Sequence, residues 1–247
     1  MEALRSYVSK WNIELTDEQL RQFEIYYEML VETNKVMNLT AITERSDVIL
    51  KHFIDSIALI TAYPEVADAS KELSVIDVGT GAGFPGIPLK ITFPHLKIIL
   101  LDSLNKRVNF LNDVINRLEL CDILAIHSRA EEGARKKEYR EVFDLCVSRA
   151  VANMASLSEY CIPFLKKGGY FIPYKSGNIE EELDQSRKAI LTLGGKLVEV
   201  KKLTLPGSLK EASQEKIERS FVIVQKTKET PKAYPRKAGT ATKNPII

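Results

Sequence analysis

The chain has 247 residues, of which 45% are hydrophobic, and its charges nearly balance at a formal net charge of +2. This length suits one large α/β domain, or such a domain with a small appendage. No stretch approaches the roughly 20 consecutive apolar residues of a membrane span, and residues 1–5 lack the apolar core of a secretory signal. We therefore expect a cytoplasmic protein that does not span a membrane.

Neither the cysteines nor the histidines indicate a metal centre. The cysteines are widely spaced, which predicts reduced thiols that are buried as small hydrophobic groups. The histidines, His52, His95 and His127, show no metal-ligand spacing. We expect no bound metal.

Residues 1–65 are predicted to form an N-terminal helical subdomain. The tetrapeptide Thr-Asp-Glu-Gln at residues 16–19 has the form of a capping box, and apolar residues follow it at helical spacing. Ser46 is predicted to cap a second amphipathic helix that continues to Ile60. Residues 34–40 are expected to form the loop between these helices.

Apolar runs and helical patterns then alternate through residues 66–227, which predicts a mostly parallel sheet covered by helices on both faces. The expected elements are strands 73–78, 97–102, 122–127, 143–148 and 168–174, which alternate with helices 85–93, 106–119, 130–138, 153–164 and 179–192. Two final strands, 196–204 and 219–226, have no helix between them. They are expected to form an antiparallel pair at the edge of the sheet, joined by a loop that includes residues 206–207.

Residues 228–247 are expected to form a basic and mostly irregular tail, because they contain several prolines and few residues that fill a core. Such a tail is either a solvated end or an arm that contacts nucleic-acid phosphates.

The most informative stretch is Val-Ile-Asp-Val-Gly-Thr-Gly-Ala-Gly-Phe-Pro-Gly at residues 75–86. An apolar strand passes an acidic residue and then breaks into glycines, where a ligand can approach bare peptide groups. Gly81, Gly83 and Gly86 also fit the dinucleotide pattern G-x-G-x-x-G, which is weak evidence taken alone.

Two carboxylates favour S-adenosylmethionine over a dinucleotide. Asp77 precedes the first glycine by two residues, where it would repel a pyrophosphate but attract an ammonium or sulfonium group. Asp102 ends the next apolar run and suits the two ribose hydroxyls, although NAD-binding folds use the same arrangement. A solvated acid at the strand end is the alternative for Asp102.

The order of elements resembles the class I S-adenosylmethionine-dependent methyltransferases, and the Leu-Lys-Lys-Gly-Gly turn at residues 165–169 adds to the match. Within that class, the chain resembles the bacterial ribosomal RNA small subunit methyltransferase G family, also called glucose-inhibited division protein B. The matching segments are residues 34–35, 38–40, 52–56, 77–89, 101–103, 106–107, 129–131, 148–150 and 234–237. Family members methylate N7 of a guanine in a conserved loop of 16S rRNA. The resemblance therefore implies S-adenosylmethionine as cofactor, and 16S rRNA or the small ribosomal subunit as partner of a monomeric enzyme.

The resemblance also implies roles for individual residues. The expected cofactor contacts are Gly79, Phe84, Asp102, Ala130, Glu131 and Arg149. Their structural alternatives are a core aromatic for Phe84, a first-turn acid for Glu131 and a surface strand-end residue for Arg149. The expected RNA contacts, outside the cofactor pocket, are Lys35, His52, Lys106, Arg236 and Lys237. One departure is Ala241, which stands where proline is common in the family.

Guanine N7 carries no proton, so its methylation needs positioning and neither a general base nor a covalent nucleophile. Arg149 is the nearest candidate for such positioning. The segment after the fourth strand, residues 148–152, lacks the N/D-P-P-Y/F sequence of enzymes that methylate exocyclic amines. Two rival hypotheses are a dinucleotide-dependent oxidoreductase, which explains the glycines alone, and a non-catalytic RNA-binding protein, which would not need an intact glycine loop.

Overall fold

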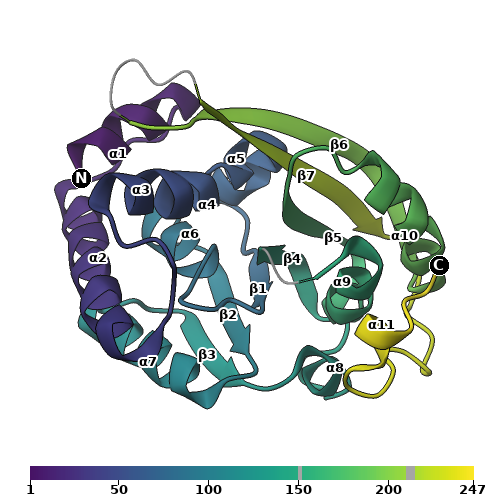
Figure 1. Ribbon diagram of the computed structural model, residues 1–247. Helices are drawn as coiled ribbons and strands as arrows, with labels where there is room; N and C mark the ends of the chain where they lie inside the picture. The colour runs from purple at the N-terminus through teal and green to yellow at the C-terminus, as the bar shows by residue number, and fades with distance from the viewer. Residues whose placement is uncertain (150–151, 210–214) are drawn as a thin grey trace.

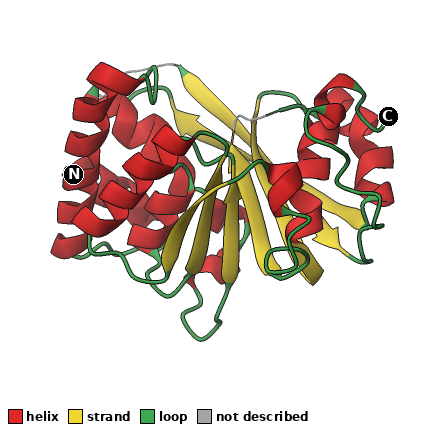
Figure 2. Ribbon diagram, turned by 90° about the horizontal axis from the view of Figure 1, so that it is seen from below, coloured by secondary structure: helices red, strands yellow, loops and turns green. Residues whose placement is uncertain are grey.

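The computed structural model describes residues 1–149, 152–209 and 215–247. They form a seven-stranded sheet with helices on both faces (Figures 1 and 2). The strands lie in the order β3-β2-β1-β4-β5-β7-β6. Their bounds are β1 Ser74–Val78, β2 Lys97–Asp102, β3 Ile123–His127, β4 Phe143–Arg149, β5 Leu165–Ser176, β6 Gly195–Pro206 and β7 Lys216–Lys226.

Strands β1 to β5 are mutually parallel, whereas β7 runs antiparallel to both β5 and β6. The predicted fold class is confirmed, including the antiparallel pair at the edge. Every predicted strand overlaps an observed one, because buried strands and amphipathic helices have different apolar periods. Ala150 of the Ser-Arg-Ala segment, and residues 210–214 of the loop between the last two strands, lie outside the described residues.

The N-terminal region is helical, as expected, but two of its boundaries differ from prediction. Its helices are α1 Glu2–Val8, α2 Asp17–Met37, α3 Arg45–Val48, α4 Asp55–Ile57 and α5 Leu59–Ala62, with a π-helical segment Ile49–Ile54. The capping box is present: the Gln19 backbone N–H donates to Thr16 Oγ1 (3.1 Å), and the Thr16 N–H donates to Gln19 Oε1 (2.8 Å).

The predicted loop at residues 34–40 is mostly wrong, since α2 continues to Met37 and ends at Asn38 in the left-handed conformation. The predicted Ser46 cap is also wrong. The Glu44 side chain accepts a hydrogen bond from the Asp47 backbone (3.0 Å) and caps α3 instead.

Two buried clusters cover the two faces of the sheet. The N-terminal helices share one cluster with α6 Gly86–Thr92 and α7 Asn105–Arg117, so they form a layer on the sheet. The opposite face carries α9 Met154–Cys161 and α10 Glu180–Thr192, with the shorter α8 Ala130–Gly133 beside them. Figure 2 shows the two helical layers on either side of the strands. The division into domains at residue 65 stays a prediction.

The C-terminal segment, residues 228–247, is not a free arm. It is mostly irregular, as expected, with one short helix, α11 Thr240–Lys243. In Figure 1 it runs beside α8 and α9. The Arg140 guanidinium donates to the backbone oxygens of Thr230 (2.8 Å) and Tyr234 (2.9 Å), which fixes the start of the segment on the protein. Among the described residues, no helix is long and apolar enough to cross a membrane.

Candidate cofactor and substrate site

The glycine loop turns sharply where β1 ends. Gly79 and Gly81 have φ values of 72° and 64°, in the left-handed region that favours glycine. The Gly79 backbone N–H donates to the carbonyl oxygen of Leu101 (2.8 Å), which ties the loop to β2. A Cβ placed on Gly81 would meet nothing within 4 Å, so this part of the loop faces open space.

Asp77 holds the loop together. Its Oδ2 accepts hydrogen bonds from Thr80 Oγ1 (2.7 Å) and from the Gly86 backbone N–H (2.8 Å), and the side chain is fully buried. Burial raises the pKa of this carboxyl to about 7. Oδ1 accepts no hydrogen bond from the described residues, and Asp77 lines none of the cavities described below. The expectation that it attracts a cationic ligand stays a prediction.

A cavity of about 400 Å³ lies against the glycine loop, at the carboxyl ends of the strands. It brings together four of the predicted cofactor residues, Gly79, Phe84, Asp102 and Arg149. Asp102 Oδ1 accepts from the Leu104 backbone N–H (2.9 Å), and Oδ2 accepts from the Gly81 backbone N–H (2.9 Å) and from Arg107 Nη1 (3.5 Å). The remaining lone pair of Oδ1 is available to a hydroxyl donor.

A second cavity, of about 220 Å³, contains the other two predicted cofactor residues, Ala130 and Glu131. Gly79 and Ser103 line both cavities, so the two form one elongated cleft that bends around the end of β1. The second cavity is also lined by Gly239 of the C-terminal segment, which the sequence placed far from the cofactor.

His52 lies inside the cleft, although it was expected to contact RNA outside it. Its ring stacks on Phe84 with centroids 4.4 Å apart, and its Nδ1 accepts a hydrogen bond from Arg149 Nη2 at 3.0 Å. Burial, and then the charge of Arg149, lowers the pKa of His52 to about 3. The imidazole is neutral near pH 7, and its Nε2–H donates to Thr40 Oγ1 (2.9 Å). The prediction that His52 lies outside the cofactor pocket is therefore wrong.

Arg149 is held by groups from distant parts of the chain. Besides His52, it donates from Nη1 to Asp55 Oδ2 (2.9 Å) and to the backbone oxygen of Lys51 (3.0 Å). The other oxygen of Asp55 accepts from Arg219 Nε of β7 (2.6 Å). Asp55 and Arg219 were not predicted as site residues, because neither belongs to a local motif that marks a ligand site.

A third cavity, of about 600 Å³, adjoins the cleft on the far side of this arginine. His52 and Arg149 line both spaces and form the boundary between them. The third cavity is also lined by Asp55, Tyr174, Lys175 and Glu182. A two-part site with a shared wall suits an enzyme that brings two ligands into contact.

The remaining predicted RNA residues line none of the three cavities. Lys35 is exposed in the last turn of α2 and pairs with Glu32. Lys106 and Lys237 are exposed and form no ion pair with the residues that the structure describes. Arg236 instead forms an ion pair with the buried Glu159. The Arg236 side chain is 28% exposed in this pair, and its expected contact with RNA stays a prediction.

Solved structures of low sequence identity share the fold. The TYW2 protein of M. jannaschii, solved in complex with AdoMet, is 16% identical with a TM-score of 0.51, over 70% of this chain and 76% of that one. The precorrin-6y C5,15-methyltransferase of Geobacter metallireducens is 13% identical with a TM-score of 0.50, over 70% of this chain and 87% of that one. The fold is that of the class I S-adenosylmethionine-dependent methyltransferases.

Relatives of higher identity define the family. The ribosomal RNA small subunit methyltransferase G of Lachnoclostridium phytofermentans is 55% identical over 236 residues, which are 95% of this chain and 93% of the relative. The protein of the same name from Lactobacillus acidophilus is 50% identical over 97% of this chain and 96% of the relative. The family model for rRNA small subunit methyltransferase G matches residues 19–212. The chain belongs to the rRNA small subunit methyltransferase G family.

Proposed function

We propose that this protein transfers a methyl group from S-adenosylmethionine to N7 of a specific guanine in 16S rRNA, in the cytoplasm. The observation that carries this proposal is the bent cleft on both sides of Gly79, which has Asp102 in one half and Glu131 in the other. A separate cavity lies on the other side of Arg149. Membership of the family supports rRNA as the substrate class. The choice of N7 rests on the family resemblance and on the chemistry of the site.

The residues of the cleft fit the cofactor. The open space at Gly81 leaves peptide groups of the loop accessible, and Asp102 Oδ1 keeps a lone pair for a ribose hydroxyl. Ala130 and Glu131 line the half of the cleft that suits the adenine. When bound, S-adenosylmethionine supplies a methyl group on a positively charged sulfur.

We infer that the target guanine enters the 600 Å³ cavity, whose size falls in the usual range of roughly 300–1,000 Å³ for small-ligand sites. Arg149 then lies between the cofactor, which donates the methyl group, and the guanine, which accepts it. Its Nη1 and Nη2 already donate to Asp55 and His52, so these donors do not compete for the N7 lone pair. The role of Arg149 is to shape the passage between the two spaces.

No side chain of the cleft has to accept a proton, because N7 carries none. His52 suits this chemistry: its Nδ1 lone pair is occupied by Arg149, and its Nε2–H donates to Thr40. The chain's own contribution is to hold two ligands in line and to exclude water from their contact.

The exposed cations at the ends of α2 and α7 and in the C-terminal segment are the proposed phosphate contacts. These are Lys35, Lys106 and Lys237. They supply affinity that does not depend on sequence, so the identity of the methylated guanine has to be read inside the 600 Å³ cavity.

The proposal is tested by transferring a tritiated methyl group to small subunits that lack the modification. Borohydride reduction and aniline cleavage, which cut at 7-methylguanine, should then produce a single break in 16S rRNA. Incorporation of label without any aniline-sensitive break would refute N7 as the acceptor. Parallel reactions on naked 16S rRNA and on intact subunits would identify the form of the substrate.

A further inference from the structure

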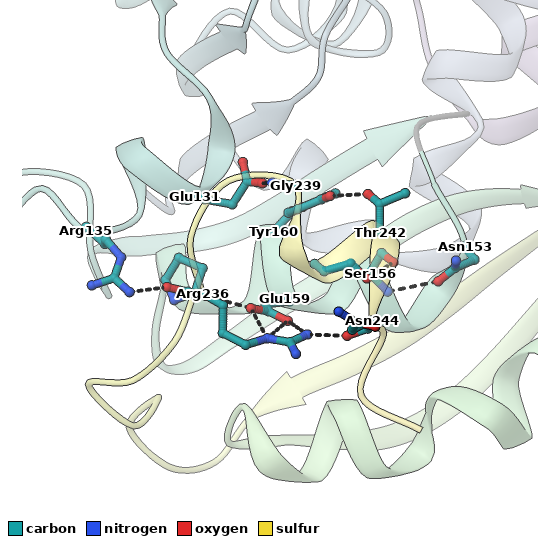
Figure 3. Close-up of polar contacts among 12 residues, drawn as sticks. Glu131, Arg135, Asn153, Ser156, Glu159, Tyr160, Arg236, Gly239, Thr242 and Asn244 are labelled. Atoms are coloured by element: carbon teal, nitrogen blue, oxygen red, sulfur yellow. Dashed lines mark hydrogen bonds and ion pairs between the residues drawn. The ribbon is translucent and has the colours of Figure 1, made fainter.

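The C-terminal segment approaches the cofactor cleft from outside the sheet. Gly239 and Thr242 line the 220 Å³ cavity together with Ala130 and Glu131. Figure 3 shows Gly239 beside Glu131. The two pairs lie more than 100 positions apart in the sequence, and Gly239 follows Glu131 by 108 positions. One wall of the cavity is therefore built from the end of the chain.

The segment fixes Glu131 directly. The Gly239 backbone N–H donates to Glu131 Oε1 (2.9 Å), and Glu131 Oε2 accepts no hydrogen bond from the described residues. Glu131 as a whole is 7% exposed, so the orientation of its carboxylate decides what it can bind. Held in this way, it presents one oxygen toward a donor in the cavity, such as an amino or hydroxyl group.

A buried ion pair anchors the segment. The Arg236 guanidinium donates from Nε (3.0 Å) and Nη2 (2.6 Å) to Glu159, and the Arg236 backbone N–H also donates to Oε1 (2.6 Å). Glu159 lies on α9 with its side chain 1% exposed. Such a carboxylate requires a partner, because an unpaired charge at this depth is costly.

The same arginine also links the two ends of residues 236–244 to each other. Arg236 Nη2 donates to the backbone oxygen of Asn244 (2.9 Å), beyond α11. Ser156 Oγ donates to the backbone oxygen of Ala241 (2.8 Å), and the hydroxyls of Tyr160 and Thr242 are 2.7 Å apart. Residues 236–244 therefore form a clasp that is bound on α9 at several points (Figure 3).

We propose that this clasp is a wall of the cofactor site for the purine-nucleoside end of the ligand, and that Arg236 is its positioning residue. The inference rests on the proposed function, since it takes S-adenosylmethionine as the ligand. In this proposal, Arg236 contributes to the affinity for the cofactor and does not contact RNA. Glu131 binds the ligand, and Arg236 acts through the clasp that orients Glu131.

The test compares S-adenosylhomocysteine binding, by calorimetry, in wild type and in Arg236→Ala. We expect at least a tenfold weaker affinity in the variant, because the clasp loses its anchor. In turnover, KM for S-adenosylmethionine should rise by a similar factor, while kcat at saturation and KM for the RNA substrate should stay unchanged. Lys232→Ala is the matched control: this exposed cation of the same segment forms no ion pair with the described residues, and its loss should change affinity less than twofold.

A second variant separates positioning from folding. Arg236→Ala leaves Glu159 buried and unpaired, so it also weakens the fold. Combining it with Glu159→Gln removes that charge and should restore much of the stability, but the cofactor affinity should remain at least tenfold reduced. If the double variant binds S-adenosylhomocysteine like wild type, the proposal is overturned.

Hydrogen exchange on the wild-type protein gives an independent result. Binding of S-adenosylhomocysteine should slow exchange of amides in residues 236–244, because a wall and its ligand stabilise each other reciprocally. Unchanged exchange there, with slower exchange in the glycine loop, would overturn the clasp and leave the proposed function intact. A wild-type protein that binds no S-adenosylhomocysteine would instead refute the proposed function, and the clasp proposal with it.

Discussion

Replacing Asp55 with asparagine should destabilise the protein strongly, because its carboxylate forms ion pairs with two arginines at once. Asp55 is fully buried, and it accepts from Arg149 Nη1 at 2.9 Å and from Arg219 Nε at 2.6 Å. Removing one partner of a buried ion pair typically costs about 3–5 kcal/mol. The two arginine side chains are 12% and 15% exposed, so they can turn partly toward water. We therefore expect a loss near the lower end, about 3 kcal/mol.

The assay is urea denaturation at neutral pH, with the free energy of unfolding extrapolated to zero urea. Asp47→Asn is the control, because Asp47 pairs with Lys51 at 3.0 Å while both side chains are more than a third exposed. Such pairs contribute about 0–1 kcal/mol. If Asp55→Asn costs no more than this control, the reasoning that Asp55 holds the two arginines in place is refuted.

Four further predictions concern the cleft and RNA binding. Gly79→Val should abolish measurable S-adenosylhomocysteine binding in calorimetry, because a branched side chain is strained at a φ of 72° and would enter the cleft. Unchanged affinity would show that the glycine loop is not part of the cofactor site. The single-turnover methylation rate should be nearly flat between about pH 6.5 and 8.5, around the usual histidine pKa of about 6.5; a tenfold rise per pH unit would require a general base. Because His52 has a pKa of about 3 in the folded protein, the unfolded chain binds the extra proton between about pH 3 and 6.5. The neutral, buried His52 therefore stabilises the fold fully above pH 6.5 and progressively less as the pH falls. On acidification, the free energy of unfolding should fall more for wild type than for His52→Asn. If the two free energies fall in parallel with pH, the prediction is contradicted. Lys106→Ala with Lys237→Ala should make the salt dependence of RNA binding shallower by roughly 0.7–0.9 log units per lost contact, whereas an identical slope would show that neither lysine meets a phosphate.

The sequence predicted the sheet well, because its signals are local. Each strand is an apolar run followed by a turn or a helix start, and the capping box of α2 needs only residues 16–19. The sequence was less informative about which of two neighbouring polar residues caps a helix. Glu44 and Ser46 both precede the apolar pattern of the next helix, and only the observed geometry selects Glu44 as the cap.

The site was predicted less completely, because several of its contacts join distant segments. The glycine loop and Asp102 lie at strand ends, which the pattern of elements places together. Nothing near Arg236 indicates that its partner is Glu159, 77 positions earlier, on the buried side of a helix. A basic residue among prolines is typical of a solvated tail, and only the tertiary structure shows the ion pair.

The strand order has a consequence for how the protein is made. β7 lies between β5 and β6, so β6 has no partner in the sheet until β7 has been synthesised. Arg219, which completes the contacts of Asp55, and the clasp at residues 236–244 also come after β6 in the chain. The first five strands are therefore synthesised before the strand that pairs with β5 at this edge of the sheet. The cleft then acquires its last walls only when the chain is nearly complete, so a nascent chain on the ribosome does not yet have a finished cofactor site.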